Sequence, residues 1–327
     1  PTPSTWAQAA DSLSNHGYGT YRLRILLSSS DAGRTLGLHI PGIASAYRLY
    51  INGELKASVG ETGTNPGGMK PGILPQSVYF TASQPELELV VQVSNFSQRK
   101  GGIWDSFRLG TSWQIAAERE QRTLFQAFIG TGLLVIGIYH IGFYFVRRDK
   151  STLCFGLASL ALAFRTAFTG DMLAYRLFPS ISWEIGVKLE YLSVLWGISF
   201  LVLYFHHLYE GTLRRPVSYG LAFTLLGISL PILVLPAKIY TEWLNVYIAV
   251  LLILVLYIVY GLVRAALRRH NGARMNLLAA IVFLATVLND ILYYNFLLET
   301  IDLVTLGLFV FLFTQMFMLA NKFASSF

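Results

Sequence analysis

The ionisable residues that lie inside long apolar segments are the first candidates for chemistry in this chain. Arg165, Glu190 and Asp290 each fall within an apolar run, with Lys188 close to Glu190 and Asn289 beside Asp290. A charge in hydrocarbon is costly, so such residues are functional candidates. Counted along helices at about 1.5 Å per residue, the three charges lie at a similar depth. Two interpretations stay open: Arg165 pairs with Glu190 or Asp290 as a structural clamp, or the cluster lines a water-filled pocket.

A polar loop near residue 100 is the second candidate site. It combines Asn95, Arg99, Trp104 and Asp105 with a pair of glycines. A tryptophan face stacks on sugar rings, whereas amide, carboxylate and guanidinium groups bond hydroxyls and acids. Arg48, on a predicted strand, is a further candidate for ligand binding. The structural alternative is that Trp104 fills a β-domain core, the glycines make a turn and Arg99 is solvated.

Motifs for other kinds of chemistry are absent from the sequence. It has no phosphate-binding glycine loop, no His-x-Glu zinc signature and no Gly-x-Ser-x-Gly elbow. His140 and the pair His206-His207 have no further convergent donors for a metal ion. The last apolar run has no lysine for a retinal Schiff base. We therefore expect no catalytic residue, no metal site and no cofactor.

Seven long apolar runs must position the buried charges. Hydrophobic residues make up 54% of the chain and charged residues only 13%, whereas a soluble globular protein has about 25% charged residues. Each run is close to the ~20 residues that a helix needs to cross a bilayer. The predicted spans lie at 123–146, 152–169, 183–208, 217–235, 243–263, 275–296 and 303–321.

The distribution of lysine and arginine predicts the orientation of these spans. Short loops rich in these residues stay in the cytoplasm. One set of connections has only Arg176, Lys188 and Lys238, with Arg119 and Arg122 before the first span. We therefore place the N-terminus outside and the C-terminus in the cytoplasm. The net charge of +7 lies mostly at helix ends, so membrane lipids are expected partners and nucleic acid is not. The basic connections carry Arg147, Arg148, Lys150, Arg214, Arg215, Arg264, Arg268, Arg269, Arg274 and Lys322.

Alternating polar and apolar residues predict a different structure before the helices. About eight short strands with frequent turns favour an antiparallel two-sheet sandwich. Asn52-Gly53 predicts a type I′ hairpin turn. The sequence thus indicates a multi-domain membrane protein, with an all-β domain at 1–115 and an all-α seven-helix domain at 116–327. Residues 112–121 are expected to form a helix continuous with the first span. The strands are predicted at 20–27, 36–40, 45–51, 54–59, 78–80, 87–93 and 103–109.

Small residues in the first two spans predict close helix packing. Gly130, Gly132 and Gly137 lie in the first span, and Gly156 and Ala158 lie in the second. Such residues let helix backbones approach each other in a membrane. They also make a homodimer a candidate assembly.

Several segments resemble one bacterial receptor family. Residues 17–25 (Gly-Tyr-Gly-Thr-Tyr-Arg-Leu-Arg-Ile), 45–54 and 95–104 resemble the extracellular sensor domain of bacterial seven-transmembrane receptors with diverse intracellular signalling modules. The resemblance covers essentially the whole chain. It implies a jelly-roll-like outer domain that recognises carbohydrate or another small ligand, and a seven-helix unit that signals to a cytoplasmic output module. In the helical half it rests on Phe164-Arg165 and on residues 189–193, 289–293 and 319–323.

The sequence therefore predicts a multi-pass receptor of the bacterial inner membrane that is not itself an enzyme. No signal peptide is visible at Pro1, so we expect that one has been removed. The last span ends close to Phe327, so we expect an output enzyme, such as a histidine kinase or a diguanylate cyclase, to follow Phe327 or to belong to a partner. Two alternatives stay open: a membrane transporter with an accessory outer domain, and an envelope scaffold.

Overall fold

The computed structural model describes residues 4–10, 13–28, 30–43, 45–294, 300 and 303–324. The chain divides into two compact units. The first, which we call the sheet unit, comprises Pro1–Gln126, Phe168–Lys188 and Leu235–Leu244. The second, which we call the helix unit, comprises Ala127–Ala167, Leu189–Val234 and Asn245–Phe327.

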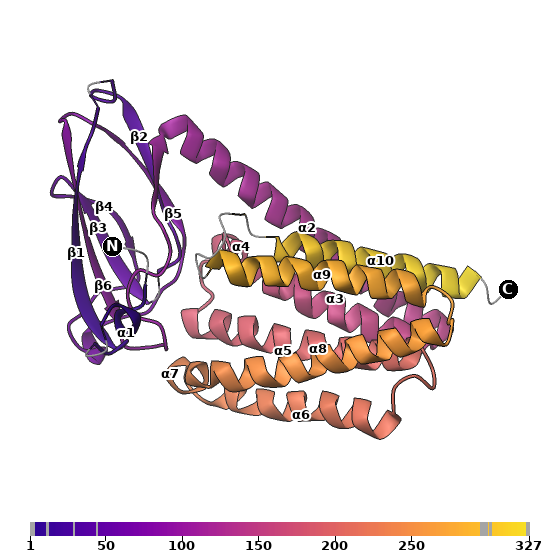
Figure 1. The fold of residues 1–327 in the computed structure, drawn as a ribbon. Helices are drawn as coiled ribbons and strands as arrows, with labels where there is room; N and C mark the ends of the chain where they lie inside the picture. The colour runs from indigo at the N-terminus through magenta and orange to yellow at the C-terminus, as the bar shows by residue number, and fades with distance from the viewer. Residues whose placement is uncertain are drawn as a thin grey trace. The chain divides into compact units, whose positions relative to one another are not determined.

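Two antiparallel sheets form the β-sandwich of the sheet unit (Figure 1). The sheet order and register place alternate residues of every strand on the inner face, as the period-two pattern predicts. The hairpin between β3 and β4 turns at Asn52 and Gly53, whose φ angles of 48° and 83° suit the predicted type I′ turn. One sheet has the order β1 (Gly17–Leu26), β6 (Glu86–Asn95), β3 (Ala46–Ile51), β4 (Glu54–Val59), and the other β5 (Gln76–Thr81), β2 (Thr35–Ile40), β7 (Arg108–Thr111).

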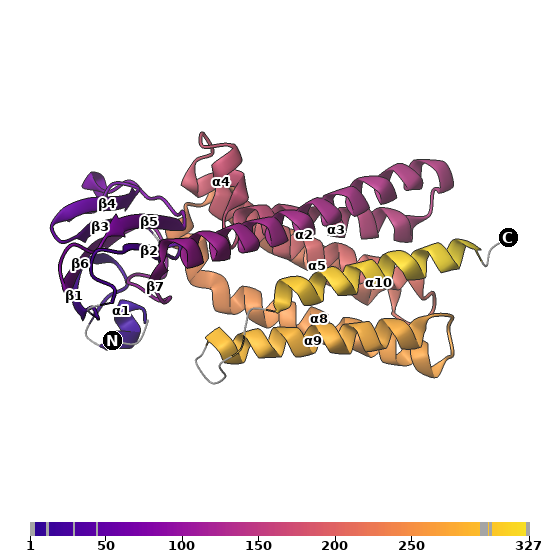
Figure 2. The ribbon, with the colours of Figure 1, turned by 90° about the horizontal axis from the view of Figure 1, so that it is seen from above.

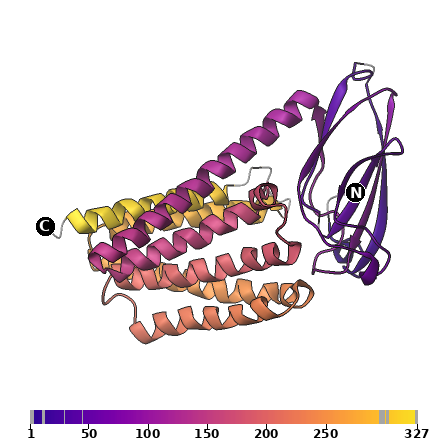
Figure 3. The ribbon, with the colours of Figure 1, turned by 180° about the vertical axis from the view of Figure 1, so that it is seen from behind.

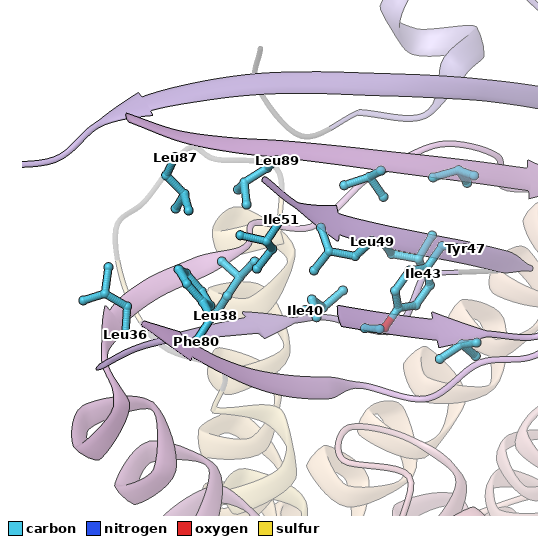
Figure 4. Close-up of a cluster of buried hydrophobic side chains, with 14 of the residues drawn as sticks. Leu36, Leu38, Ile40, Ile43, Tyr47, Leu49, Ile51, Phe80, Leu87 and Leu89 are labelled. Carbon is cyan, nitrogen blue, oxygen red and sulfur yellow. The ribbon is translucent and has the colours of Figure 1, made fainter. Parts of the chain in front are cut away.

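Apolar side chains from both sheets fill the space between them (Figure 4). Leu36, Leu38 and Ile40 of β2 face Leu49 of β3 and Leu89 of β6, and all five are buried. Burying such a side chain fully stabilises the fold by about 1.5–3 kcal/mol. This shared core is what holds the two sheets together.

The described residues form seven strands, one at each of the seven predicted ranges, but the last strand is shorter than predicted. The predicted strand at 103–109 is wrong over most of its length, because β7 begins at Arg108. The backbone before it pairs with the N-terminal segment instead: Ser4 N–H donates to Ile103 O at 2.9 Å, and Trp6 N–H donates to Gly101 O at 3.0 Å. Trp6, in the short helix α1 (Trp6–Ala9), packs against the sandwich core, and its Nε1 donates to Tyr21 Oη at 2.6 Å.

Long helices occupy the seven predicted positions, and in the helix unit they lie alongside one another (Figures 2 and 3). Six described helices are long and apolar enough to cross a membrane, and the last contains a shorter apolar stretch, Leu306–Ala320. Residues 295 and 296, the end of the sixth predicted span, lie outside the described residues. The helices are α2 (Ser112–Arg147), α3 (Lys150–Phe168), α5 (Trp183–Leu208), α6 (Arg215–Val234), α8 (Leu244–Leu267), α9 (Ala273–Tyr294) and α10 (Val304–Ala324). Short turns of helix, α4 (Leu173–Leu177), α7 (Ala237–Tyr240), η1 (Pro66–Gly68) and η2 (Thr241–Trp243), lie in connections.

The glycines of the first two spans bring α2 and α3 into backbone contact. A Cβ atom added at Gly137 would lie 3.1 Å from the carbonyl oxygen of Gly156, and one added at Gly156 would lie 3.0 Å from that of Gly137. A Cβ at Gly130 would lie 2.9 Å from Thr166 Oγ1. The predicted role in close packing is thus confirmed within the chain, whereas the homodimer stays a prediction.

Candidate functional site

Asn95 organises the loop in which we predicted a ligand site. Its side chain lies at the end of β6 and is fully buried. Its Oδ1 accepts a hydrogen bond from Ser45 Oγ at 2.6 Å, and its Nδ2 donates to the carbonyl oxygens of Asn15, Gln98 and Lys100 at 2.7–3.0 Å. With an amide's donors and acceptor already used inside the chain, Asn95 is better suited to shape the loop than to touch a ligand.

Three other predicted ligand residues follow Asn95 on the same loop. Trp104 is half-buried, and Lys100 Nζ lies 5.7 Å from its ring centroid, within the range of a cation–π contact. Asp105 is exposed, and the backbone N–H of Arg99 donates to Thr241 Oγ1 at 3.2 Å. The aromatic residue that packs against the core from the N-terminal side is Trp6, not Trp104.

Arg48 lies on a strand rather than on this loop. It is an exposed residue of β3, opposite Ser58 of β4 and Gln92 of β6. Its neighbours in sequence, Tyr47 and Leu49, are fully buried in the core. Alternation along the strand therefore places Arg48 on the outer face of the four-stranded sheet.

The start of α2 is packed on the outer face of the three-stranded sheet. β7 ends at Thr111 and α2 begins at Ser112, so strand passes directly into helix. Ile115 is buried, and a Cβ atom added at Gly37 of β2 would lie only 2.8 Å from Ile115 Cβ. Real Cβ contacts are essentially never that short, so this approach of helix to strand requires glycine at position 37.

His39 and Arg122 form a polar contact between the same strand and the same helix. Arg122 Nη2 donates to His39 Nε2 at 3.0 Å, and His39 Nδ1 donates to Ser77 Oγ at 3.1 Å. This pattern needs the neutral Nδ1–H tautomer, because arginine only donates. Burial, followed by the charges of Arg122 and Arg108, lowers the pKa of His39 from 6.5 to about 4. The imidazole is therefore neutral near pH 7.

The connection after α3 joins this contact region. Thr123 Oγ1 donates to Asp171 Oδ2 at 2.8 Å, and Gln126 Oε1 accepts from the Asp171 N–H at 2.8 Å. Arg176 Nη2 donates to the carbonyl oxygen of Pro75 at 3.3 Å. The first turns of α2, the sheet and this connection therefore belong to one packed structure. We call Gly37, His39, Ile115, Arg122 and Asp171 the junction cluster.

Sequence reasoning missed most of the junction cluster. It predicted a helix over 112–121 but gave no role to Gly37, His39 or Asp171. The available signal was weak: Gly37 and His39 alternate with Leu36, Leu38 and Ile40, and so read as ordinary outward-facing strand positions. Their burial depends on a helix that is distant in sequence from β2.

Two of the three predicted intramembrane charges lie together in the helix unit. Arg165 Nη1 of α3 lies 3.9 Å from Glu190 Oε1 of α5. The neighbouring predicted residue Lys188 lies on α5, and its Nζ is 3.8 Å from Glu184 Oε1 one turn earlier. The Arg165–Glu190 distance fits the clamp interpretation, in which one charge compensates the other.

Asp290 binds the beginning of the last helix. Its carboxylate is buried; Oδ1 accepts from the Leu303 N–H at 2.8 Å, and Oδ2 accepts from the Val304 N–H at 3.0 Å. Asn289 Nδ2 donates to Asp290 Oδ1 at 3.0 Å. Because α10 begins at Val304, Asp290 acts as an N-terminal cap, where a negative charge also meets the positive end of the helix dipole.

Comparison with known proteins gives weak matches for the β-domain. No curated protein matches the chain. Crystal structures of a GH2 beta-galacturonidase from Eisenbergiella tayi, bound to galacturonate or to glycerol, are 19% identical, with a TM-score of 0.26, over 33% of this chain and 19% of theirs. A putative beta-galactosidase from Bacteroides fragilis is 20% identical, with a TM-score of 0.24, over 32% of this chain and 17% of its own. The match thus spans less than a fifth of each enzyme, and such low scores carry no argument about function.

The helical half gives a clear match. The family described as 7TM diverse intracellular signalling matches residues 122–322, which include most of α2 and all six later long helices to near the end of α10. This is well over half of the chain, and it agrees with the apolar helices described above. The protein is therefore a multi-pass membrane protein that belongs to the 7TM diverse intracellular signalling family.

Proposed function

We propose that this protein is a transmembrane signalling receptor of the bacterial inner membrane. In this proposal the β-sandwich lies outside the cytoplasm and binds a small ligand, and the seven helices relay the binding event to a cytoplasmic output module. The chain itself catalyses no reaction. Membership of a signalling family and the lysine and arginine bias of the helix ends support this assignment.

The observation that carries the proposal is the continuity of α2. The helix has 36 residues, or about 54 Å at 1.5 Å per residue. Its first part, to Gln126, belongs to the sheet unit through the junction cluster, and the rest belongs to the helix unit. The second part is about 32 Å long, close to the ~30 Å hydrocarbon core of a bilayer. The single helix α2 therefore packs on the sandwich with its first part and is long enough to cross the membrane with its second part.

A break in α2 tests the relay. Ala117→Pro removes a helix hydrogen bond and costs ~3 kcal/mol or more in a helix interior. The proposal expects ligand binding within about twofold of the parent. It expects loss of the ligand-dependent change in distance between spin labels at Arg214, just before α6, and Asn271, between α8 and α9. Ala117→Ser is the matched control. A distance change that persists after the break would contradict relay through α2.

We propose that the ligand is a saccharide or another small polar molecule, bound near Trp104. A half-buried indole beside an exposed carboxylate suits a sugar ring and its hydroxyls. Arg99 and Arg48 are the remaining candidate contacts. Titration with a panel of sugars and sugar acids should show binding that Trp104→Ala weakens by about tenfold or more. Tyr18→Ala, which removes an exposed aromatic ring elsewhere in the β-domain, should leave binding unchanged.

Transport is the second candidate function, because the Arg165–Glu190 pair lies within membrane helices. A transporter would move its substrate across liposomes that contain the purified chain, and Arg165→Ala would abolish that flux. Ligand-dependent distance changes without flux would support the receptor. An envelope scaffold would show neither flux nor a ligand-dependent change.

A further inference from the structure

The helix unit has a polar groove at one end, where α3 begins, α5 ends and α6 begins. Its volume is about 500 Å³. The groove lies entirely within the helix unit and is separate from both the Trp104 loop and the Arg165–Glu190 pair. Its principal lining residues are Lys150, His206, His207, Glu210, Arg215 and Tyr219.

Hydrogen-bond donors converge in this groove. His207 Nε2 lies 3.1 Å from Tyr219 Oη, and the Arg215 guanidinium stands 5.7 Å from the Tyr219 ring centroid. The ring of His206 meets Tyr219 edge-on at 5.7 Å. His206 Nδ1 is buried, with no hydrogen-bond partner in the described part of the chain. Lys150 and Arg215 are exposed, so their N–H groups can reach the acceptor atoms of a ligand in the groove.

The loop beside the groove is held in place by arginines. Arg264 Nη1 donates to Thr212 O at 3.0 Å, and Arg268 Nη1 donates to Gly211 O at 2.8 Å. α6 begins at Arg215, so the positive end of a 20-residue helix lies at the same place. Two carboxylates oppose these charges: Glu210 lines the groove, and Asp149 accepts from the Thr152 N–H at the start of α3. Cations nonetheless outnumber carboxylates.

We propose that this groove binds a phosphate-bearing anion. Arginine, lysine, histidine and a helix N-terminus together form the set of donors that recognises phosphate. Basic pockets between helices at the cytoplasmic ends of membrane proteins bind anionic lipid head groups. A soluble phosphate compound offers the same acceptor oxygens. The site goes beyond the proposed function, because it gives the helix unit a ligand of its own.

Binding to the purified chain in nanodiscs tests the proposal. One arm compares phosphatidylcholine discs with and without phosphatidylglycerol, and counts the retained anionic lipid by native mass spectrometry. The other arm titrates inorganic phosphate and pyrophosphate into pure phosphatidylcholine discs by calorimetry. The double variant Lys150→Gln/Arg215→Gln should weaken binding by about tenfold or more in whichever arm is positive. Lipid binding alone identifies a head-group site, and phosphate binding alone identifies a soluble ligand.

Two further variants separate loss of the site from loss of the fold. Arg274→Gln removes a charge from a different groove of the helix unit and should leave binding within about threefold of the parent. Glu210→Gln removes the groove's carboxylate and should strengthen binding by about threefold or more, which misfolding cannot do. The proposal is overturned if neither arm shows binding, or if the double variant and Arg274→Gln have equal effects.

Discussion

Gly37 is the residue on which the packing of α2 against the sheet depends most directly. Gly37→Ala would place a methyl group 2.8 Å from Ile115 Cβ. We expect it to lower the free energy of unfolding by about 1–3 kcal/mol, because overpacking forces the helix or the strand to move. Thermal unfolding and hydrogen exchange over residues 112–126 measure the effect.

The neighbouring glycine on β7 supplies the control for this prediction. A Cβ at Gly110 would meet only the flexible end of Gln114, at 3.2 Å, before it reaches Ile115. Gly110→Ala should therefore have a smaller effect. The double variant Gly37→Ala/Ile115→Ala should lose less unfolding free energy than the sum of the losses in the two single variants, because the alanine at 115 relieves the overpacking. Equal effects of the two glycine variants would argue against a close contact at Gly37.

His39 makes the junction cluster sensitive to acid. Its pKa is lowered to about 4 by burial and by Arg122, Arg108 and Arg119, with Asp171 opposing them. Because the unfolded state takes up the proton first, stability is complete above pH ~6.5 and falls as the pH drops toward ~4. We expect a loss of about 2 kcal/mol at pH ~5.

His39→Gln tests this pH dependence because glutamine does not titrate. Thermal unfolding of the variant should vary less between pH ~7.5 and ~5 than that of the parent. His16→Gln, which replaces a histidine before β1 and outside the junction cluster, is the matched control. A parent-like slope in the His39 variant would show that other groups control the acid response.

Arg165 and Glu190 should behave as a coupled pair. Removing either charge removes the attraction between them within the membrane helices, so Arg165→Ala and Glu190→Ala should each destabilise the chain. The double variant should lose less than the sum, with a coupling energy of about 0.5–3 kcal/mol. Unfolding in mixed detergent and denaturant measures it. Additive losses would mean that the 3.9 Å approach contributes no net attraction.

Sequence could identify these residues only where their rarity was informative. Arg165 and Glu190 stood out because charges are rare in apolar runs, and depth counting predicted that they could meet. Gly37 and His39 are common residue types on a strand, and their importance comes from a helix that covers them. Asn95 suggested ligand binding, but an amide that organises a loop carries the same sequence signal.

At the scale of elements, α10 depends on a residue of α9. Asp290 accepts hydrogen bonds from the first two backbone N–H groups at the α10 start, although it precedes Val304 by 14 positions. Asp290→Ala should destabilise the chain by about 0.5–2 kcal/mol, the usual cost of losing a cap. Hydrogen exchange should increase at 303–306.

Asp290→Asn separates capping from charge, because it keeps an acceptor oxygen but loses the negative charge. We expect an intermediate effect, with part of the loss due to the helix dipole. Asn289→Ala, which removes a donor to Asp290 rather than an acceptor for α10, should have less effect on exchange at 303–306. Unchanged exchange in Asp290→Ala would refute the cap.

Helix positions could be read from sequence far better than helix contacts. The third span was predicted at 183–208, and α5 is Trp183–Leu208. The length of the apolar run is enough to predict where such a membrane helix begins and ends. β7 was misplaced because Ile103 and Phe107 give an apolar pattern but pack on the core from a loop. The Asp290 cap was not predictable, since a cap usually adjoins its helix in sequence.

At the scale of the whole molecule, orientation in the membrane is the main prediction to test. Cys154 is the single cysteine and is buried. A Cys154→Ala background therefore allows one reactive cysteine to be placed at Ser58 and, separately, at Asn271, both of which are exposed. A membrane-impermeant maleimide should label position 58 in intact cells. It should label position 271 only after the membrane is permeabilised, and the reverse pattern would mean that the topology is inverted.

Composition predicted that sheets come first and membrane helices follow. It did not predict which of the two units each connection between the helices belongs to. The connections 168–188 and 235–244 belong to the sheet unit, although they join membrane helices. Contacts such as Arg176 to Pro75 and Arg99 to Thr241 link them to the β-domain. Each of these hydrogen bonds joins residues that are far apart in the sequence, and one partner in each is a backbone group. A backbone group does not depend on residue type, so the sequence could not predict these contacts.

The unbroken helix α2 also limits how this protein can be recombined with other members of its family. A chimera that exchanges the sandwich at residue 115 would separate Gly37 from the turn that packs on it, whereas a joint beyond Gln126 keeps the packing intact. Each residue added or removed at the joint rotates everything that follows by about 100°. Insertions of seven residues nearly restore the original facing, and insertions of two reverse it. Chimeras that signal should therefore appear at joint lengths that differ by about one or two whole helical turns. The number of residues at the joint in α2 then matters as much as the choice of outer domain.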